Sequence, residues 1–72
     1  MKTVRQLIDE ARMKHLDVCI ETKEGAYEEV FGGGWAAVGE YCWMKEEKFF
    51  DGFSVLGIKI LDEGIMIINV DY

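Results

Sequence analysis

The feature that most constrains this chain is its last eighteen residues, which read as a β-hairpin with apolar side chains on both faces. Two runs rich in β-branched residues, 55–61 and 65–72, flank the three-residue loop Asp62-Glu63-Gly64, where Gly supplies a left-handed conformation. Because side chains alternate along a strand and opposite residues share a side, pairing the runs gives one wholly apolar face. Its predicted pairs are Ile60 with Met66, Ile58 with Ile68, and Leu56 with Val70.

The other face of this hairpin is apolar near the turn, where it carries Leu61, Ile65 and Ile67. Leaving these three side chains in water would forgo roughly 1.5 to 3 kcal/mol each, which together is comparable with the net stability of a small domain, about 5 to 15 kcal/mol. The sequence offers one convincing helix to cover a sheet. We therefore expect a partner or a loop to cover the second face, with a homodimer as the first candidate.

Length and composition place the chain among small folded domains. Its 72 residues make one domain, residues 1–72, near the size at which a single core barely offsets chain entropy. Half of the residues are hydrophobic and 12% are aromatic, which excludes a disordered chain. No apolar run approaches the ~20 residues of a membrane span, and the first residues lack a secretory stretch, so we expect a cytoplasmic protein. The spacing of Cys19 and Cys42 matches no zinc or redox motif, which predicts free thiols.

Charge is distributed unevenly along the chain. Residues 1–16 hold four basic and two acidic side chains, and residues 17–72 hold four basic and twelve acidic ones, so +2 and −8 give the net −6. This balance argues against direct binding to nucleic acid, whose phosphates require clustered Lys and Arg. It permits docking to a basic protein partner. The alternative is that the acidic residues only keep a small apolar domain soluble.

The remaining pattern predicts an α+β fold. Residues 3–15 form an amphipathic helix that starts with a capping box. Residues 18–23 and 35–44 show the alternation of strands. Residues 26–31 fit either a short strand, which we favour, or one helical turn, and residues 49–53 form a bulky loop. The prediction is a helix packed on a three- to four-stranded, mainly antiparallel sheet that ends in the C-terminal hairpin. The capping box is Thr3 with Gln6, and the stripe of the helix that packs on the sheet is Val4, Leu7, Ile8, Ala11 and His15.

No catalytic, cofactor-binding or metal-ligating residue is predicted, and no cofactor. The segment 32–37 satisfies the dinucleotide pattern G-x-G-x-x-A, but that pattern must open a helix inside a parallel βαβ unit, and here it leads into a strand pattern. The single histidine, His15, has no second ligand of its own type and suits a helix C-terminus. Ser54 lies between Phe53 and Val55, with nothing to indicate an activated nucleophile.

Aromatic residues in the middle of the chain are the strongest candidates for an interface. Tyr and Trp combine a large apolar area with a polar tip, and they dominate the residues that carry binding energy at protein interfaces. The alternative is an ordinary core beneath the helix, and the sequence leaves the two interpretations evenly balanced. The candidate interface residues are Tyr27, Phe31, Trp35, Tyr41 and Trp43, together with Leu61, Ile65 and Ile67 of the hairpin.

Four glutamates are candidates for an acidic surface or for a pair of catalytic carboxylates. Neighbouring strands could bring them together, and like-charge repulsion could then tune one as a general acid and another as a base. Solvated strand faces carry the same pattern, so a small carboxylate-dependent hydrolase stays an alternative from a different class. The residues are Glu21, Glu28, Glu29 and Glu40.

Residues 3–10 and 17–21, TVRQLIDE and DVCIE, resemble the helix-then-strand beginning of many small uncharacterised proteins from phages and mobile elements of Gram-positive bacteria. The run 55–60, VLGIKI, is similar to their ends, and residues 32–53 depart from the pattern. The resemblance implies a phage-type context, in which small acidic proteins act as inhibitors of host defence nucleases by occupying basic nucleic-acid channels.

The function predicted from the sequence is a small, acidic, non-catalytic protein-interaction module that self-associates through its sheet. The first alternative is a phage-type inhibitor that mimics nucleic acid to block a basic nuclease channel. The second alternative is the carboxylate-dependent hydrolase.

Overall fold

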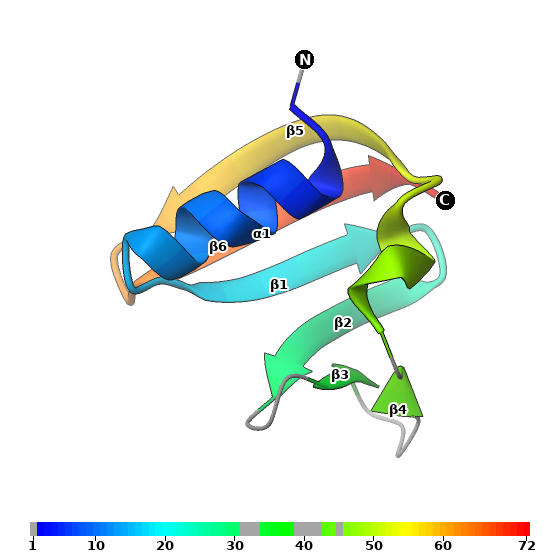
Figure 1. Cartoon of the computed structure of the whole chain (residues 1–72), viewed down its shortest axis with the longest axis horizontal. Helices are drawn as coiled ribbons and strands as arrows, with labels where there is room; N and C mark the ends of the chain where they lie inside the picture. The colour runs from blue at the N-terminus through cyan, green and yellow to red at the C-terminus, as the bar shows by residue number, and fades with distance from the viewer. Residues whose placement is uncertain (1, 31–33, 39–42, 45) are drawn as a thin grey trace.

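An α-helix packs against a curved β-sheet in the described part of this protein (Figure 1). The computed structural model describes residues 2–30, 34–38, 43–44 and 46–72, with residues 43 and 44 described by their backbone. The predicted α+β class is confirmed. Within the described residues the elements, in chain order, are α1 (Val4–Met13), β1 (Asp17–Thr22), β2 (Gly25–Val30), β3 (Gly34–Ala37), β4 (Trp43–Met44), the 3-10 helix η1 (Glu47–Phe50), β5 (Ser54–Leu61) and β6 (Ile65–Asp71).

The strands of the described chain form one six-stranded sheet in the order β4-β3-β2-β1-β6-β5. Neighbouring strands are antiparallel except β1 and β6, which are parallel. The prediction of three to four strands is therefore too low, and it misses the parallel pair, because β1 and β6 lie far apart in the sequence and no local signal links them. Residues 35–44, predicted as one strand, divide into β3 and β4, with residues 39–42 outside the described part. The strand favoured over residues 26–31 is confirmed as β2.

The helix α1 begins as the sequence predicts and ends earlier. The Thr3 hydroxyl accepts from the Gln6 N–H at 3.2 Å, and the Gln6 side chain accepts from the Thr3 N–H at 2.8 Å, which makes the predicted capping box. The helix ends at Met13, so His15 is exposed and lies outside the buried stripe. The residues of the stripe that are buried are Val4, Leu7, Ile8 and Ala11.

His15 ends the helix in a conformation that suits glycine. Its φ is 57°, in the left-handed region, while its N–H donates to the Arg12 carbonyl at 3.1 Å and the Leu16 N–H donates to the Ala11 carbonyl at 2.8 Å. These two bonds form a Schellman motif, whose left-handed position is usually glycine. A side chain in this conformation costs roughly 1 to 2 kcal/mol.

We expect His15→Gly to raise the free energy of unfolding by about 1 kcal/mol, because glycine adopts the left-handed conformation without steric cost. Urea unfolding followed by circular dichroism measures the change. His15→Ala is the matched control and should give no gain, since alanine keeps the Cβ. A loss of stability in the glycine variant would mean that the imidazole makes a stabilising contact.

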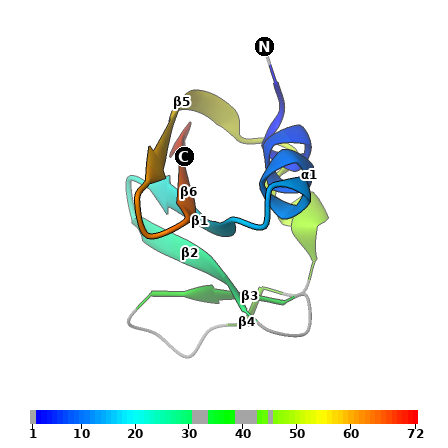
Figure 2. The ribbon, with the colours of Figure 1, turned by 90° about the vertical axis from the view of Figure 1, so that its left-hand side faces the viewer.

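The core fills the space between the sheet and the helices α1 and η1, which lie on one side of it (Figure 2). β1 contributes Val18 and Ile20, and β6 contributes Met66, Ile68 and Val70, all with no more than 2% of their surface exposed. These two neighbouring strands therefore supply the centre of the sheet surface that faces α1.

Residues 49–53, predicted to form a loop, close one end of this core with aromatic rings. Phe50, the last residue of η1, and Phe53 are buried. The Phe50 ring lies 4.9 Å from the Trp35 ring and 5.3 Å from the Phe53 ring, both edge to face. Such pairs stabilise by about 0.5 to 1.5 kcal/mol beyond area burial. The segment after β4 is therefore part of the core.

Ion pairs tie α1 to the elements beside it. Arg12 donates from Nε to Oε1 of Glu29 on β2 at 2.9 Å, and its Nη2 pairs with Glu47 of η1. The hydrogen bond to Glu29 raises the pKa of Arg12, which keeps the guanidinium charged. Arg5 pairs with Asp51 at 2.7 Å. Because exposed pairs add at most about 1 kcal/mol each, this network orients α1 and η1 more than it stabilises them.

Candidate protein-interaction surface

The C-terminal hairpin forms as predicted, and β5 is an edge strand of the described sheet. The predicted pairs Ile60 with Met66 and Ile58 with Ile68 are confirmed. Gly64 closes the turn with φ 84°, the left-handed conformation that the loop sequence predicts. An edge strand leaves a row of N–H and C=O groups unpaired, and these can pair with a strand of another chain.

The predicted pair of Leu56 with Val70 is wrong. A bulge between Val55 and Gly57 adds one residue to β5, so Val55 lies opposite Val70 and Leu56 has no cross-strand partner. A side-chain pattern of strict alternation does not reveal such an insertion. The bulge leaves Leu56 with 64% of its surface exposed.

Aliphatic side chains of β5 are exposed although they face the same side as the core. Ile58 is 49% and Ile60 is 51% exposed, whereas their partners on β6, Ile68 and Met66, are fully buried. The main sheet contacts of α1 are with β1 and β6. A helix with its side chains is about 10 to 12 Å wide and strands lie about 4.8 Å apart, so one helix covers about two strands. β5 is the third strand and extends beyond this cover.

A groove of about 350 Å³ lies between the start of α1 and β5. Leu7 of α1 and Val55 and Leu56 of β5 give it apolar walls, and Lys2 is the charged residue that lines it. Val55 also packs against the core. The groove and the overhanging strand thus form one apolar surface. This β5 surface consists of the groove together with Leu56, Ile58 and Ile60.

The face of the sheet opposite α1 carries no helix within the described chain (Figure 2). Leu61, Ile65 and Ile67, the residues predicted to need cover, lie on this uncovered face and are partly buried. Ile67 lies between Lys59 of β5 and Cys19 of β1. These three aliphatic side chains therefore have less surface to lose on association than those of the β5 surface.

Cys19 lies near the middle of the uncovered face as a free, half-buried thiol. Burial raises the pKa of this thiol, and the nearby Glu28 and Glu21 add to the effect. Because the thiolate is the reactive and metal-binding form, a raised pKa favours an inert thiol. The predicted free thiol is confirmed for Cys19, and Cys42 lies outside the described residues.

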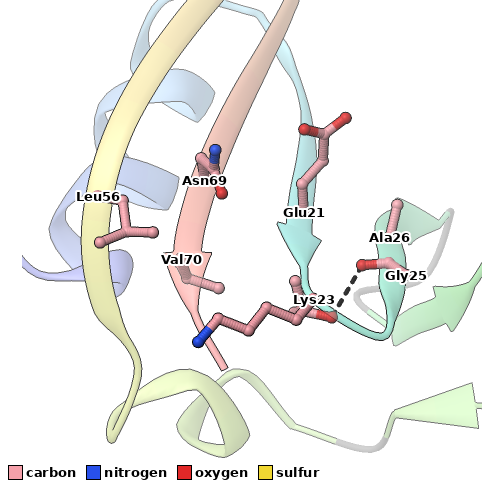
Figure 3. A pocket seen from close by; sticks show the side chains of 8 residues that line it. Glu21, Lys23, Gly25, Ala26, Leu56, Asn69 and Val70 are labelled. Atoms are coloured by element: carbon pink, nitrogen blue, oxygen red, sulfur yellow. Dashed lines mark hydrogen bonds between the residues drawn. The ribbon is translucent and has the colours of Figure 1, made fainter.

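A hollow of about 460 Å³ opens at the end of the sheet where β1 turns into β2 (Figure 3). Its lining is mixed, with Glu21 and Asn69 as well as Leu56. Lys23 pairs with Asp71 at 2.7 Å, and this contact raises the pKa of the Lys23 ammonium. The residues that line the hollow include no His, Cys or Ser.

The aromatic residues predicted for an interface lie in different environments. Trp35 is fully buried, so it belongs to the core and offers no surface to a partner. Tyr27 is half-buried and packs against that core. Phe31 and Tyr41 lie outside the described residues, and Trp43 is described by its backbone in β4.

The four glutamates predicted for an acidic or catalytic surface do not gather in one place. Glu28 and Glu29 are neighbours on β2 and point to opposite faces. Glu29 lies on the side of α1, where it binds Arg12. Glu21 and Glu28 share the uncovered face, but the strand register does not place them opposite each other. Glu40 lies outside the described residues.

The other sequence motifs gain no chemistry from the fold. Residues 34–37 of the glycine-rich segment form β3 and do not open a helix, so the dinucleotide pattern lacks the setting that it requires. His15 and Ser54 are both exposed; His15 lies in the turn after α1 and Ser54 begins β5. Among the described residues, no group of three His, Cys, Asp or Glu side chains could hold a metal ion. No helix in that part of the chain has the length and apolar character needed to cross a membrane.

No protein-family model matches this chain, and no curated protein or solved structure matches it.

Proposed function

We propose that this protein is a non-catalytic protein-interaction module that self-associates through the free edge of β5. The observation that carries the proposal is an eight-residue edge strand with three exposed aliphatic side chains beside an apolar groove. Long apolar edge strands template pairing with another chain, and proteins that do not use them protect them with charges, Pro, bulges or a covering helix. β5 contains no Pro, a single charged residue, Lys59, and one bulge, at Leu56.

The exposed side chains of β5 favour a symmetric pair over a one-sided contact. Full burial of a Leu or Ile side chain contributes roughly 1.5 to 3 kcal/mol, so covering the exposed parts of Leu56, Ile58 and Ile60 contributes roughly 2.5 to 5 kcal/mol per copy. Association costs about 4 to 15 kcal/mol in lost freedom. Two copies related by two-fold symmetry cover twice this apolar surface, and new backbone hydrogen bonds add to the gain.

The other surfaces considered from the sequence give less support to an interaction. Among the candidate aromatic residues, Trp35 is fully buried in the core and offers no surface to a partner. On the uncovered face, Leu61, Ile65 and Ile67 are already partly buried, so a partner there would cover less new apolar surface. The β5 surface combines unpaired backbone groups with exposed aliphatic side chains, and both favour strand pairing.

The inhibitor and hydrolase alternatives also receive less support. A nucleic-acid mimic needs several free carboxylates on one surface, and Glu29 is engaged by Arg12 on the other side of the sheet. A hydrolase needs two carboxylates that share a site, and Glu21 and Glu28 are not opposite each other on their strands.

Light scattering over a concentration series tests self-association. We expect the mass to rise from 8.3 kDa in dilute solution toward twice that value at high micromolar concentration, because strand pairing of this size gives a modest affinity. A native circular dichroism spectrum at each concentration would exclude aggregation of unfolded chains. A mass of 8.3 kDa at every concentration up to about 1 mM would contradict the proposal.

A further inference from the structure

The alternation of side chains along β5 restricts how two copies can pair. Ile58 and Ile60 face the side of α1, because their cross-strand partners belong to the core. Gly57 and Lys59 face the other side. Lys59 is the one charged residue of the strand, and Gly57 is the one residue without a side chain. The strand thus carries a charge and an open position on the same face, two residues apart.

Two copies that extend one sheet through β5 run antiparallel about a two-fold axis perpendicular to the sheet, so facing residues share a side. With the axis at Lys59, two ammonium groups would lie opposite each other, which is destabilising, and Leu56 would remain outside the apolar contact. With the axis at Gly57, every facing pair beside the axis would include a residue at or before the bulge, where the alternation of β5 is broken. The first register is therefore opposed by charge and the second by the bulge.

We infer that the partner at the β5 surface is a second copy of this chain, joined with the two-fold axis at Ile58. In this register Ile58 faces the partner's Ile58, and Ile60 lies beside Leu56 at the partner's bulge, so the exposed aliphatic side chains of the two copies come together along the edge. Lys59 faces the partner's Gly57, which offers space and no charge. The inference rests on the proposed function and adds the register in which the β5 strands of the two copies pair.

Gly57 gives a direct test of this register. A Cβ at this position would meet no atom within 4 Å, and the backbone there is not left-handed, so a side chain fits the protomer. We expect Gly57→Glu to place a carboxylate opposite the partner's Lys59 twice per dimer and to lower the dissociation constant roughly 3- to 10-fold at low ionic strength. The gain should disappear in about 1 M salt, where exposed charges are screened within about 3 Å.

The matched control is Gly52→Glu. Gly52 is equally open to a side chain and lies before β5 in the chain, so this variant carries the same added charge away from the pairing edge. We expect it to leave the dissociation constant unchanged or to raise it slightly, because each copy becomes more acidic. Lys59→Ala should change the constant by less than about twofold, since Lys59 faces a glycine in the inferred register.

Analytical ultracentrifugation of the wild type and the three variants separates the outcomes. If Gly57→Glu binds no tighter than Gly52→Glu, or if Lys59→Ala tightens the dimer severalfold, the register with the axis at Ile58 is wrong, while self-association stands. If the wild type stays monomeric, self-association itself fails, and the register fails with it. A tighter, salt-sensitive dimer that only Gly57→Glu produces supports both.

Discussion

Replacing Phe50 by alanine should lower the free energy of unfolding by about 3 to 5 kcal/mol. The Phe50 side chain is fully buried, and its ring lies 4.9 Å from Trp35, 5.3 Å from Phe53 and 5.8 Å from Tyr27. Alanine would leave a cavity that this rigid ring cluster cannot fill. The net stability of a small domain is about 5 to 15 kcal/mol, so this loss would move the midpoint of urea unfolding to a much lower urea concentration.

The neighbouring Phe49 provides the matched control for this experiment. It belongs to the same 3-10 helix and is 39% exposed, so Phe49→Ala removes the same ring from a partly solvated position. We expect less than half the loss seen for Phe50→Ala. Equal losses for the two variants, or a loss below about 1 kcal/mol for Phe50→Ala, would contradict the conclusion that the Phe50 ring of η1 closes one end of the core.

Ile58→Lys should abolish dimer formation at concentrations where the wild type is fully dimeric. In the inferred register the substitution places two ammonium groups opposite each other at the two-fold axis and removes the central apolar contact. Because Ile58 is already 49% exposed in the protomer, the folded monomer should lose only about 1 to 1.5 kcal/mol. Light scattering reports the mass, and urea unfolding reports the stability of the protomer.

Two further lysine variants identify the surface responsible. Met13 is 82% exposed at the end of α1 and does not line the groove of the β5 surface, so Met13→Lys should leave the mass of the dimer unchanged. Ile67→Lys places the same charge on the uncovered face and should also leave the dimer intact. If Ile67→Lys dissociates the dimer and Ile58→Lys does not, the copies associate through the uncovered face instead of the β5 edge.

The parts of the fold that the sequence predicts are those decided within a few neighbouring residues. The capping box needs only Thr3 and Gln6, which are one helical turn apart. The hairpin turn needs only the glycine at position 64 and the β-branched runs on either side of it. In each case the physical cause lies within one element or one turn, so a pattern in the sequence carries it.

The parts that the sequence does not predict depend on residues that are distant in the chain. The parallel pairing of β1 with β6 has no turn to signal it. The burial of Phe50 and Phe53 depends on Trp35, which reaches them only through the folded sheet. The bulge at Leu56 leaves the composition of β5 apolar and changes only which side of the sheet the residues before it face. A run of apolar residues in the sequence does not reveal such a change.

For the candidate surface, the sequence predicts that apolar area exceeds what one helix can cover. It assigns that excess to Leu61, Ile65 and Ile67, whereas the most exposed aliphatic side chains of the hairpin are Leu56, Ile58 and Ile60. The difference arises from the width of α1 relative to the sheet, since the main sheet contacts of the helix are with β1 and β6, and these three side chains of β5 stay exposed. Strand order decides which side chains the helix reaches, and strand order is not a local property.

The parallel pairing of β1 with β6 also sets the order in which this chain can fold during synthesis. β1 follows directly after α1, but one of its two neighbours is the last of the described strands to be made. The ribosome adds the core residues of β6 only at that point; they are Met66, Ile68 and Val70. Until β6 emerges from the ribosome, the nascent polypeptide holds an amphipathic helix without its full packing surface, and chaperones have that interval in which to bind it.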